Sequence, residues 1–308
     1  MKKKTYKNQN ILGTMWKDRW MYILLIPGII YYALFAYKPM WGVFFAFQNY
    51  SITRGFWGSA WVGFEHFERF FSSMWFGRLF GNTTILAVLN MVFYFPAPII
   101  LALLLNEVKN QLFKRSVQSL TYLPHFLSWV VIVSIFQNLL SIETGPVNTF
   151  LRALGMEPVA FLQIPEWFRP LIMLEIIWRE IGWGTIIFLA ALASVDVELY
   201  EAAIVDGANH RDRLWHITLP GIRPTIIVML ILRLGSFMNT GFEQIYLMTN
   251  SMNREVAEVF DTYVYRVGIQ GGQFSYSTAI GLFKSVIGLA LVFLSDKLAK
   301  KAGEEGIL

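Results

Sequence analysis

Five ionisable side chains interrupt long apolar stretches of this 308-residue sequence: Glu175, Arg179, Glu180, Arg233 and Lys284. A charge at a lipid-facing midpoint of a bilayer costs about 2.5–3.5 kcal/mol, so each of these groups is expected to face protein or water. Such groups can line a polar path across a membrane, or they can form ion pairs that hold helices together. The sequence leaves both roles open.

The spacing of these charges adds two expectations. Glu175 and Arg179 are four residues apart with the acid first, which favours an ion pair on one helix face. At about 1.5 Å per residue, Arg179, Arg233 and Lys284 each lie roughly 12–16 Å into their stretches, near the middle of a membrane.

Motifs for enzymatic or metal chemistry are missing from the sequence. It contains no H-E-x-x-H or G-x-S-x-G pattern, so a membrane protease or acyltransferase has no motif to support it. There are no cysteines. The four histidines show no metal-ligand spacing and are interpreted as interfacial or loop residues: His66, His125, His210 and His216. We therefore predict a protein that is not an enzyme and has no metal site.

The elements that must position the five charges are predicted to be membrane-spanning helices. Hydrophobic residues make up 55% of the sequence and charged residues 15%, against about a quarter charged in ordinary soluble domains. The net charge is +5, but the basic residues flank the apolar stretches, as membrane topology requires, and no nucleic-acid partner is expected. This composition predicts an all-α, polytopic membrane protein in contact with lipid.

A helix needs about 20 mostly apolar residues to cross a bilayer. Six stretches qualify: residues 20–37, 79–105, 120–140, 170–193, 222–238 and 277–295. The first stretch follows a basic region, but no small-x-small cleavage site comes after it, so we interpret it as an uncleaved first helix rather than a signal peptide.

Lysine and arginine residues set the predicted orientation. They concentrate before the first stretch and after the second, fourth and sixth, which places both termini in the cytoplasm. The loops that then face outward are residues 38–78, 141–169 and 241–276. The predicted division is 1–78 for an N-terminal tail, first helix and outward interfacial loop, 79–298 for a core of five helices, and 299–308 for a cytoplasmic tail.

The loop of residues 195–220, between the fourth and fifth stretches, is polar and amphipathic. Glu201 and Asp206 are interleaved with apolar residues at helical spacing, and paired alanines favour a helix with a low-relief surface. Gly207 is a plausible helix stop, and Pro220 marks the entry to the next membrane helix. A short helix with an exposed carboxylate suits docking in a groove of another protein.

The residue types and spacings of this loop resemble the EAA loop of ABC-importer permeases. The matching positions are Glu201-Ala202-Ala203, Gly207 four positions later, and Ile217-Thr218-Leu219-Pro220. Six helices with such a loop between the fourth and fifth resemble the type I importer fold. More narrowly, the chain resembles the oligosaccharide-importing branch named after the lipoplastic-protein B type in "YKPMWGVFFAF", "SAWVGFEHFERFF", "TYVYRVGIQGGQFSYSTAIGLFKSVI" and "KLAKKAGEEGIL".

The resemblance implies that the loop is a coupling helix, which sits in a cleft of a cytoplasmic ATPase and transmits nucleotide-driven closure to the membrane helices. Glu201 would pair with a basic residue of the ATPase, Ala202 and Ala203 would allow close approach, and Gly207 would form the bend. Asp206 is a further candidate. The remaining positions of the motif are Ile217, Leu219 and Pro220.

The resemblance also implies partners and a location. The partners would be a second homologous permease in a heterodimer, two cytoplasmic ATP-binding subunits and an extracytoplasmic solute-binding protein, all at a bacterial cytoplasmic (inner) membrane. The sequence has no G-x-x-x-x-G-K-[ST] loop to wrap nucleotide phosphates, so ATP and Mg²⁺ would be bound by the separate ATPase subunit, and no cofactor is expected in this chain.

The expected function is uptake of an oligosaccharide delivered by the binding protein. The five charges would then line a polar path together with Trp178, Trp183 and Asn239, where aromatic faces can stack on sugar rings. Two alternatives stay open: an importer for another solute such as a peptide, and an ion-coupled secondary carrier. The EAA loop and the absence of two matching halves disfavour the carrier.

Overall fold

The computed structural model describes residues 16, 18–301 and 303, and this part of the chain is mostly helical. The predicted basic N-terminal tail lies outside the described residues up to position 15, as do most residues of the tail after position 301. Five helices are long and apolar enough to cross a membrane: Arg19–Phe47, Met74–Glu107, Pro165–Ala193, His210–Gly235 and Phe274–Lys301. A bent pair, Gln111–Phe126 and Trp129–Leu139, brings the number to six if it counts as one span. The all-α, multi-span prediction is confirmed.

These spans are built from shorter segments, several of which are π-helical. The elements are α2 (Arg19–Tyr32), η1 (Ala33–Tyr37), α3 (Lys38–Met40), η2 (Trp41–Phe47), β1 (Gln48–Asn49), α4 (Gly55–Gly58), β2 (Ala60–Trp61), α5 (Glu65–Phe71), α6 (Met74–Leu89), η3 (Asn90–Tyr94), α7 (Pro96–Glu107), α8 (Gln111–Tyr122), η4 (Leu123–Phe126), α9 (Trp129–Leu139), α10 (Pro146–Ala153), α11 (Pro165–Ala193), α12 (Val197–Val205), α13 (His210–Arg213), η5 (Leu214–Thr218), α14 (Leu219–Gly235), α15 (Phe242–Met248), α16 (Arg254–Ala257), α17 (Phe260–Val264), η6 (Tyr265–Gln270) and α18 (Phe274–Lys301).

The third span is not the continuous helix expected over residues 120–140. Its two halves meet at an angle of 105°. Leu127 and Ser128 have extended backbone there, and Ser128 caps the new helix α9 by accepting a hydrogen bond from the Val131 N–H at 3.4 Å. Pro124 begins the break because it lacks an N–H and restricts the residue before it. The apolar run is continuous in sequence, but the helix is not.

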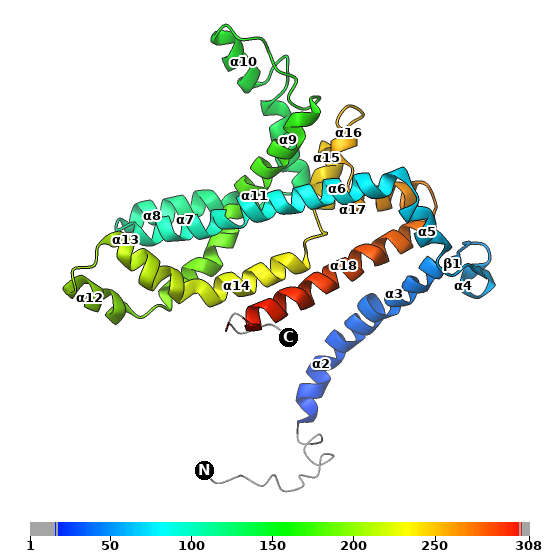
Figure 1. Cartoon of the computed structure of the whole chain (residues 1–308), viewed down its shortest axis with the longest axis horizontal. Helices are drawn as coiled ribbons and strands as arrows, with labels where there is room; N and C mark the ends of the chain where they lie inside the picture. The colour runs from blue at the N-terminus through cyan, green and yellow to red at the C-terminus, as the bar shows by residue number, and fades with distance from the viewer. Residues whose placement is uncertain (1–15, 17, 302, 304–308) are drawn as a thin grey trace.

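Helix α11 forms the centre of the bundle. It packs on α7, α8, η4, α9, α14 and α15, and its buried face joins a cluster of apolar side chains from α9, α15 and the loops beside them. The loop that carries α12 and α13 lies at one end of the structure, and the β1–β2 hairpin with α4 and α5 lies at the opposite end (Figure 1). The ends of the spans therefore present two separate loop surfaces.

The first span is attached to the rest of the chain at one end only. None of the residues of α2 is buried, and in Figure 1 this helix runs away from the bundle. Its continuation η2 packs against α18 and buries Ala46. The packing of α2 must therefore come from lipid or from another chain.

Gly182 permits the closest approach of α11 to α8. A Cβ at this position would overlap the backbone carbonyl of Thr121, which cannot move away as a flexible side chain could. Gly81 in α6 is a suitable control position, because it is also a glycine in a membrane helix but nothing lies within 4 Å of a Cβ built there.

We expect Gly182→Ala to lower the thermal unfolding midpoint, because overpacking of this kind costs about 1–3 kcal/mol. Gly81→Ala should leave the midpoint unchanged or raise it slightly, since alanine favours a helix over glycine by up to about 1 kcal/mol. The measurement is thermal unfolding of each purified variant in detergent. Equal midpoints for the two variants would contradict the assigned contact.

Candidate functional site

Helix α12, in the loop of the EAA pattern, is defined at both ends by local hydrogen bonds. At its start the Asp196 carboxylate accepts from the Glu198 N–H at 2.9 Å. At its end the Ala208 N–H donates to the Ala203 carbonyl at 2.9 Å, and Gly207 adopts φ 81°. Glycine reaches this left-handed conformation without the steric cost that other residues bear. The helix and its stop at Gly207 confirm the sequence prediction.

No residue of α12 is buried in the chain. Leu199 is 53% exposed, Ile204 56% and Val205 87%, so the helix presents an apolar surface as well as the exposed carboxylate of Glu201. Ala202 is exposed and Ala203 half-buried, which leaves a low-relief strip between the larger side chains. Apolar surface of this kind on a loop indicates an interaction site.

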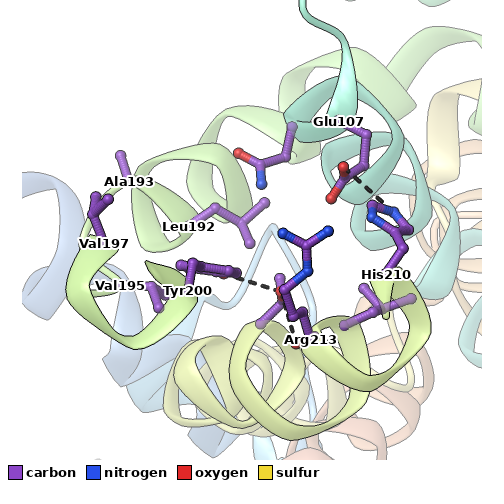
Figure 2. A pocket seen from close by; sticks show the side chains of 11 residues that line it. Glu107, Leu192, Ala193, Val195, Val197, Tyr200, His210 and Arg213 are labelled. Carbon is purple, nitrogen blue, oxygen red and sulfur yellow. Dashed lines mark hydrogen bonds and ion pairs between the residues drawn. The ribbon is translucent and has the colours of Figure 1, made fainter. Parts of the chain in front are cut away.

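Behind α12 lies a polar cavity of about 410 Å³, shown in Figure 2. It is enclosed by the ends of α7 and α11 and by α12 and α13, and Arg213 points into it. The His210 ring faces Glu107 across one side, with 3.4 Å between Nε2 and Oε2. This contact joins the loop to the end of the second span.

A pair of hydroxyl groups connects α12 to the fifth span. The Thr218 hydroxyl donates its single proton to the Arg213 carbonyl at 3.3 Å. The Tyr200 hydroxyl is therefore the donor in its 3.0 Å hydrogen bond to Thr218 Oγ1 (Figure 2). Thr218 is buried and is the last residue of the π-helical segment η5. Short π-helical turns within helices are frequently found at functional sites. Ile217 lies in η5, and α14 follows with Leu219 and Pro220 in its first turn.

The charges inside the spans have specific partners, and one expected pair is wrong. Arg179 does not pair with Glu175: its Nη1 donates to Glu180 Oε1 at 2.5 Å, and its other nitrogens donate to the carbonyls of Leu127 and His125 at 3.2 and 3.3 Å. The extended residues at the break of the third span leave those carbonyls free to accept. A helix pattern could not show this, because the acceptors come from the break itself.

Glu175 is fully buried and accepts from Gln244 Nε2 at 2.7 Å, which joins α11 to α15. Lys284 forms an ion pair with Asp261, which joins α18 to α17. Both groups are therefore in ties between helices. Neither Gln244 nor Asp261 was among the residues singled out from the sequence, because both lie outside the predicted spans.

Arg233 lies at a different place in the bundle. Its Nη2 donates to Asn90 Oδ1 at 2.7 Å, and its guanidinium lies 5.0 Å from the centre of the Tyr94 ring. It borders a cavity of about 230 Å³ between η3, α7, α11 and α14, and it lines a smaller cleft together with the exposed Asn239. Asn90 is a partner that the sequence could have indicated, since it is a polar residue inside an apolar stretch.

The two tryptophans of α11 differ in their surroundings. Trp183 stacks on the His125 ring with 4.4 Å between centroids, and His125 Nδ1 lies 2.9 Å from Glu180 Oε2. Trp178 contacts Phe136 of α9 at 5.9 Å and is 38% exposed. His125 was interpreted from the sequence as an interfacial or loop residue; in the structure it belongs to a polar cluster with Arg179 and Glu180.

Among the described residues, no group of three or more His, Cys, Asp or Glu side chains could hold a metal ion. The geometry thus gives an exposed helix on a loop and several polar ties within the spans.

Comparisons with known proteins agree with this arrangement. Residues 94–303 match the family described as "Binding-protein-dependent transport system inner membrane component". The chain is 56% identical to "Protein LplB" of Bacillus subtilis (strain 168), over 96% of this chain and 93% of that protein. It is 52% identical to the "Polygalacturonan/rhamnogalacturonan transport system permease protein YteP" of the same organism, over 99% of this chain and 95% of that protein.

Solved structures give the same result. A chain of a bacterial alginate ABC transporter, crystallised in complex with an alginate pentasaccharide-bound periplasmic protein, superposes with a TM-score of 0.90 at 39% identity and covers 97% of this chain and 100% of that chain. A second structure, of an ABC transporter involved in the import of the acidic polysaccharide alginate, gives a TM-score of 0.89 at 40% identity, covering 95% of this chain and 99% of that chain. The chain is therefore a multi-pass membrane protein that belongs to the family of binding-protein-dependent transport system inner membrane components.

Proposed function

We propose that this chain is the membrane-spanning subunit of an ATP-driven importer that takes up an oligosaccharide from an extracytoplasmic binding protein. The observation that carries the proposal is α12, an exposed helix with an apolar surface and a carboxylate on the loop between two spans. Relatives with similar sequences along nearly the whole chain are named for saccharide transport, which supports the substrate class. The same relatives are permeases, so we propose that this chain does not itself catalyse a reaction.

The coupling surface of the proposal consists of α12 and the start of α14. Glu201 pairs with a basic group of a cytoplasmic ATPase, Ala202 and Ala203 permit close contact, and Gly207 sets the bend; Asp206 lies at the rim. The movement then passes to the membrane through Ile217, Leu219 and Pro220. ATP and Mg²⁺ are bound by two separate ATP-binding subunits, and a second, homologous permease completes the membrane part.

The proposed substrate path follows the polar groups that border open space. Trp178, Arg179, Glu180 and Trp183 lie along α11, and Arg233 and Asn239 border the clefts beside α14. Glu175 and Lys284 support the path from behind, because their side chains hold α15 and α17 against the bundle. Alternating access then changes which side of the membrane this path opens to.

The proposed location is the cytoplasmic membrane of a bacterium, with both termini in the cytoplasm. This orientation puts α12 on the same side as the ATPase and the β1–β2 hairpin on the side of the binding protein. The proposed division at residues 78 and 298 separates a core of five helices from the first span and its outward loop, consistent with an α2 that buries no residue.

The function is tested by purifying the tagged chain in mild detergent with its chromosomal neighbours expressed. We expect recovery of a second permease and an ATPase, whose ATP hydrolysis rises when a saccharide-loaded binding protein is added. A chain that purifies alone and supports ion-driven uptake would overturn the proposal.

Glu201→Lys should lower saccharide uptake by about tenfold or more, because it replaces one member of a charge pair by a like charge, which costs roughly 2–5 kcal/mol. Uptake by the complete importer in membrane vesicles is the measurement, with membrane insertion checked by immunoblot. Glu157→Lys, the same change on an exposed residue of an outward loop, is the control and should leave uptake unchanged. Normal uptake by Glu201→Lys would remove the coupling role.

Tyr200→Phe deletes only the hydroxyl that joins α12 to Thr218. A net hydrogen bond is worth about 0.5–1.5 kcal/mol, so we expect roughly two- to tenfold less saccharide transported per ATP hydrolysed, while the ATPase still binds. Thr218→Ser keeps the hydroxyl and should retain the normal ratio. The ratio of uptake to phosphate release in proteoliposomes measures this. An unaltered ratio in Tyr200→Phe would show that the movement passes elsewhere.

A further inference from the structure

A second polar cavity, of about 440 Å³, lies in the segment 241–276 and is separate from the groups assigned to the path. Its size falls in the range of roughly 300–1,000 Å³ that is usual for small-molecule sites. The helices that enclose it lie beside α6, away from α12 (Figure 1). Its lining residues include Tyr246, Thr249, Arg254, Glu258, Arg266 and Gln270.

The aromatic residue of this lining, Tyr246, is held in place by two other rings. The Phe242 and Tyr246 rings stack with 5.4 Å between centroids, and Tyr265 packs against both at 5.1 and 5.3 Å. Tyr246 is 42% exposed, and its hydroxyl accepts from Gln270 Nε2 at 3.5 Å. A rigid, half-exposed aromatic ring with polar groups at its edge offers a flat apolar face and hydrogen bonds to the same ligand.

The cavity lining also holds an oriented ion pair. Arg266 Nε donates to Glu258 Oε1 at 2.7 Å, and the guanidinium lies 5.0 and 5.1 Å from the ring centres of Tyr263 and Trp75. Burial raises the pKa of the Tyr263 hydroxyl, which therefore stays neutral beside the guanidinium. The side chain of Arg266 is thus fixed in direction by a carboxylate and two rings.

This pair has unused hydrogen-bonding capacity. Glu258 Oε2 and Arg266 Nη2 are buried, and neither has a hydrogen-bond partner in the described part of the chain. Buried polar atoms without partners are uncommon in folded proteins, and each calls for an explanation. A ligand hydroxyl beside the pair can donate to the carboxylate and accept from the guanidinium.

Arg254 adds the charge that this pair lacks. Glu258 neutralises Arg266, whereas Arg254 is exposed at the rim of the same cavity. The three charged groups that line the cavity therefore leave one net positive charge, carried by a guanidinium that can bind a carboxylate with two parallel hydrogen bonds.

We propose that this cavity is a subsite for one acidic sugar unit of the transported saccharide, with the ring on Tyr246, the hydroxyls on Glu258 and Arg266, and the carboxylate on Arg254. The inference rests on the proposed function, which it extends from saccharides in general to those that carry carboxylates. Arg254 then determines specificity, since it is the group that distinguishes a charged sugar from a neutral one.

The test uses the complete importer with its binding protein in proteoliposomes and two probes, trigalacturonate and its fully methyl-esterified form. The ester keeps the three rings and removes the charges. The variants are Arg254→Gln and Arg254→Lys, and Arg54→Gln is the control because Arg54 is an exposed arginine of the loop predicted to face outward, distant in sequence from the cavity. Initial uptake is measured with each probe at saturating binding protein.

We expect Arg254→Gln to lower uptake of the acid by roughly tenfold, the value of one charge-assisted hydrogen-bonded contact, and uptake of the ester by less than about twofold. Arg254→Lys should fall between, and Arg54→Gln should match the unsubstituted importer with both probes. Equal losses on acid and ester, or no loss on the acid, would overturn the inference.

The failure of the inference and that of the proposed function are distinguishable. An unsubstituted importer that takes up the ester and rejects the acid overturns the inference alone. An unsubstituted importer whose ATPase responds to its saccharide-loaded binding protein but which takes up neither probe also overturns the inference alone. An ATPase that responds to no saccharide-loaded binding protein overturns the proposed function, and the inference with it.

Discussion

The structure depends on the rule that a polar group inside a lipid bilayer must be satisfied by the protein itself. Four charges within the spans each bind a group on a different element. Arg179 holds the broken end of η4, Arg233 holds η3, Lys284 holds α17 and Glu175 holds α15. Because every such tie joins segments far apart in sequence, the need to neutralise polar groups also fixes how the helices are arranged.

Features encoded over a few neighbouring residues could be predicted from the sequence. Apolar stretches long enough to cross a bilayer identified the spans, and glycine at position 207 identified the end of α12, since its left-handed conformation excludes most side chains. The break at residue 127 could not be placed in this way. Pro124 indicates a disturbance, but a proline can also begin a helix, and only the capping by Ser128 and packing on α11 turn the chain through a sharp angle.

The partners of the charges could not be predicted, because an ion pair is chosen by three-dimensional distance. A spacing of four residues made Glu175 the expected partner of Arg179. In the structure Glu175 is buried against α15 and accepts a hydrogen bond from Gln244 instead. The cavity lined by Arg254 and Arg266 lay outside sequence reasoning for the same reason, since its walls come from several short helices of one loop. Local patterns thus identified the coupling helix, whereas the polar sites required the fold.

The first span has a mechanical consequence. It is continuous over the 29 residues of Arg19–Phe47, about 44 Å if fully α-helical, while a hydrocarbon core is about 30 Å thick. A helix longer than the core can tilt or extend into the headgroup regions. The end formed by η2 is held against α18, whereas α2 buries no residue, so the tilt of α2 can change without disturbing a core contact. The tilt of this helix in the bilayer is therefore independent of the packing inside the bundle.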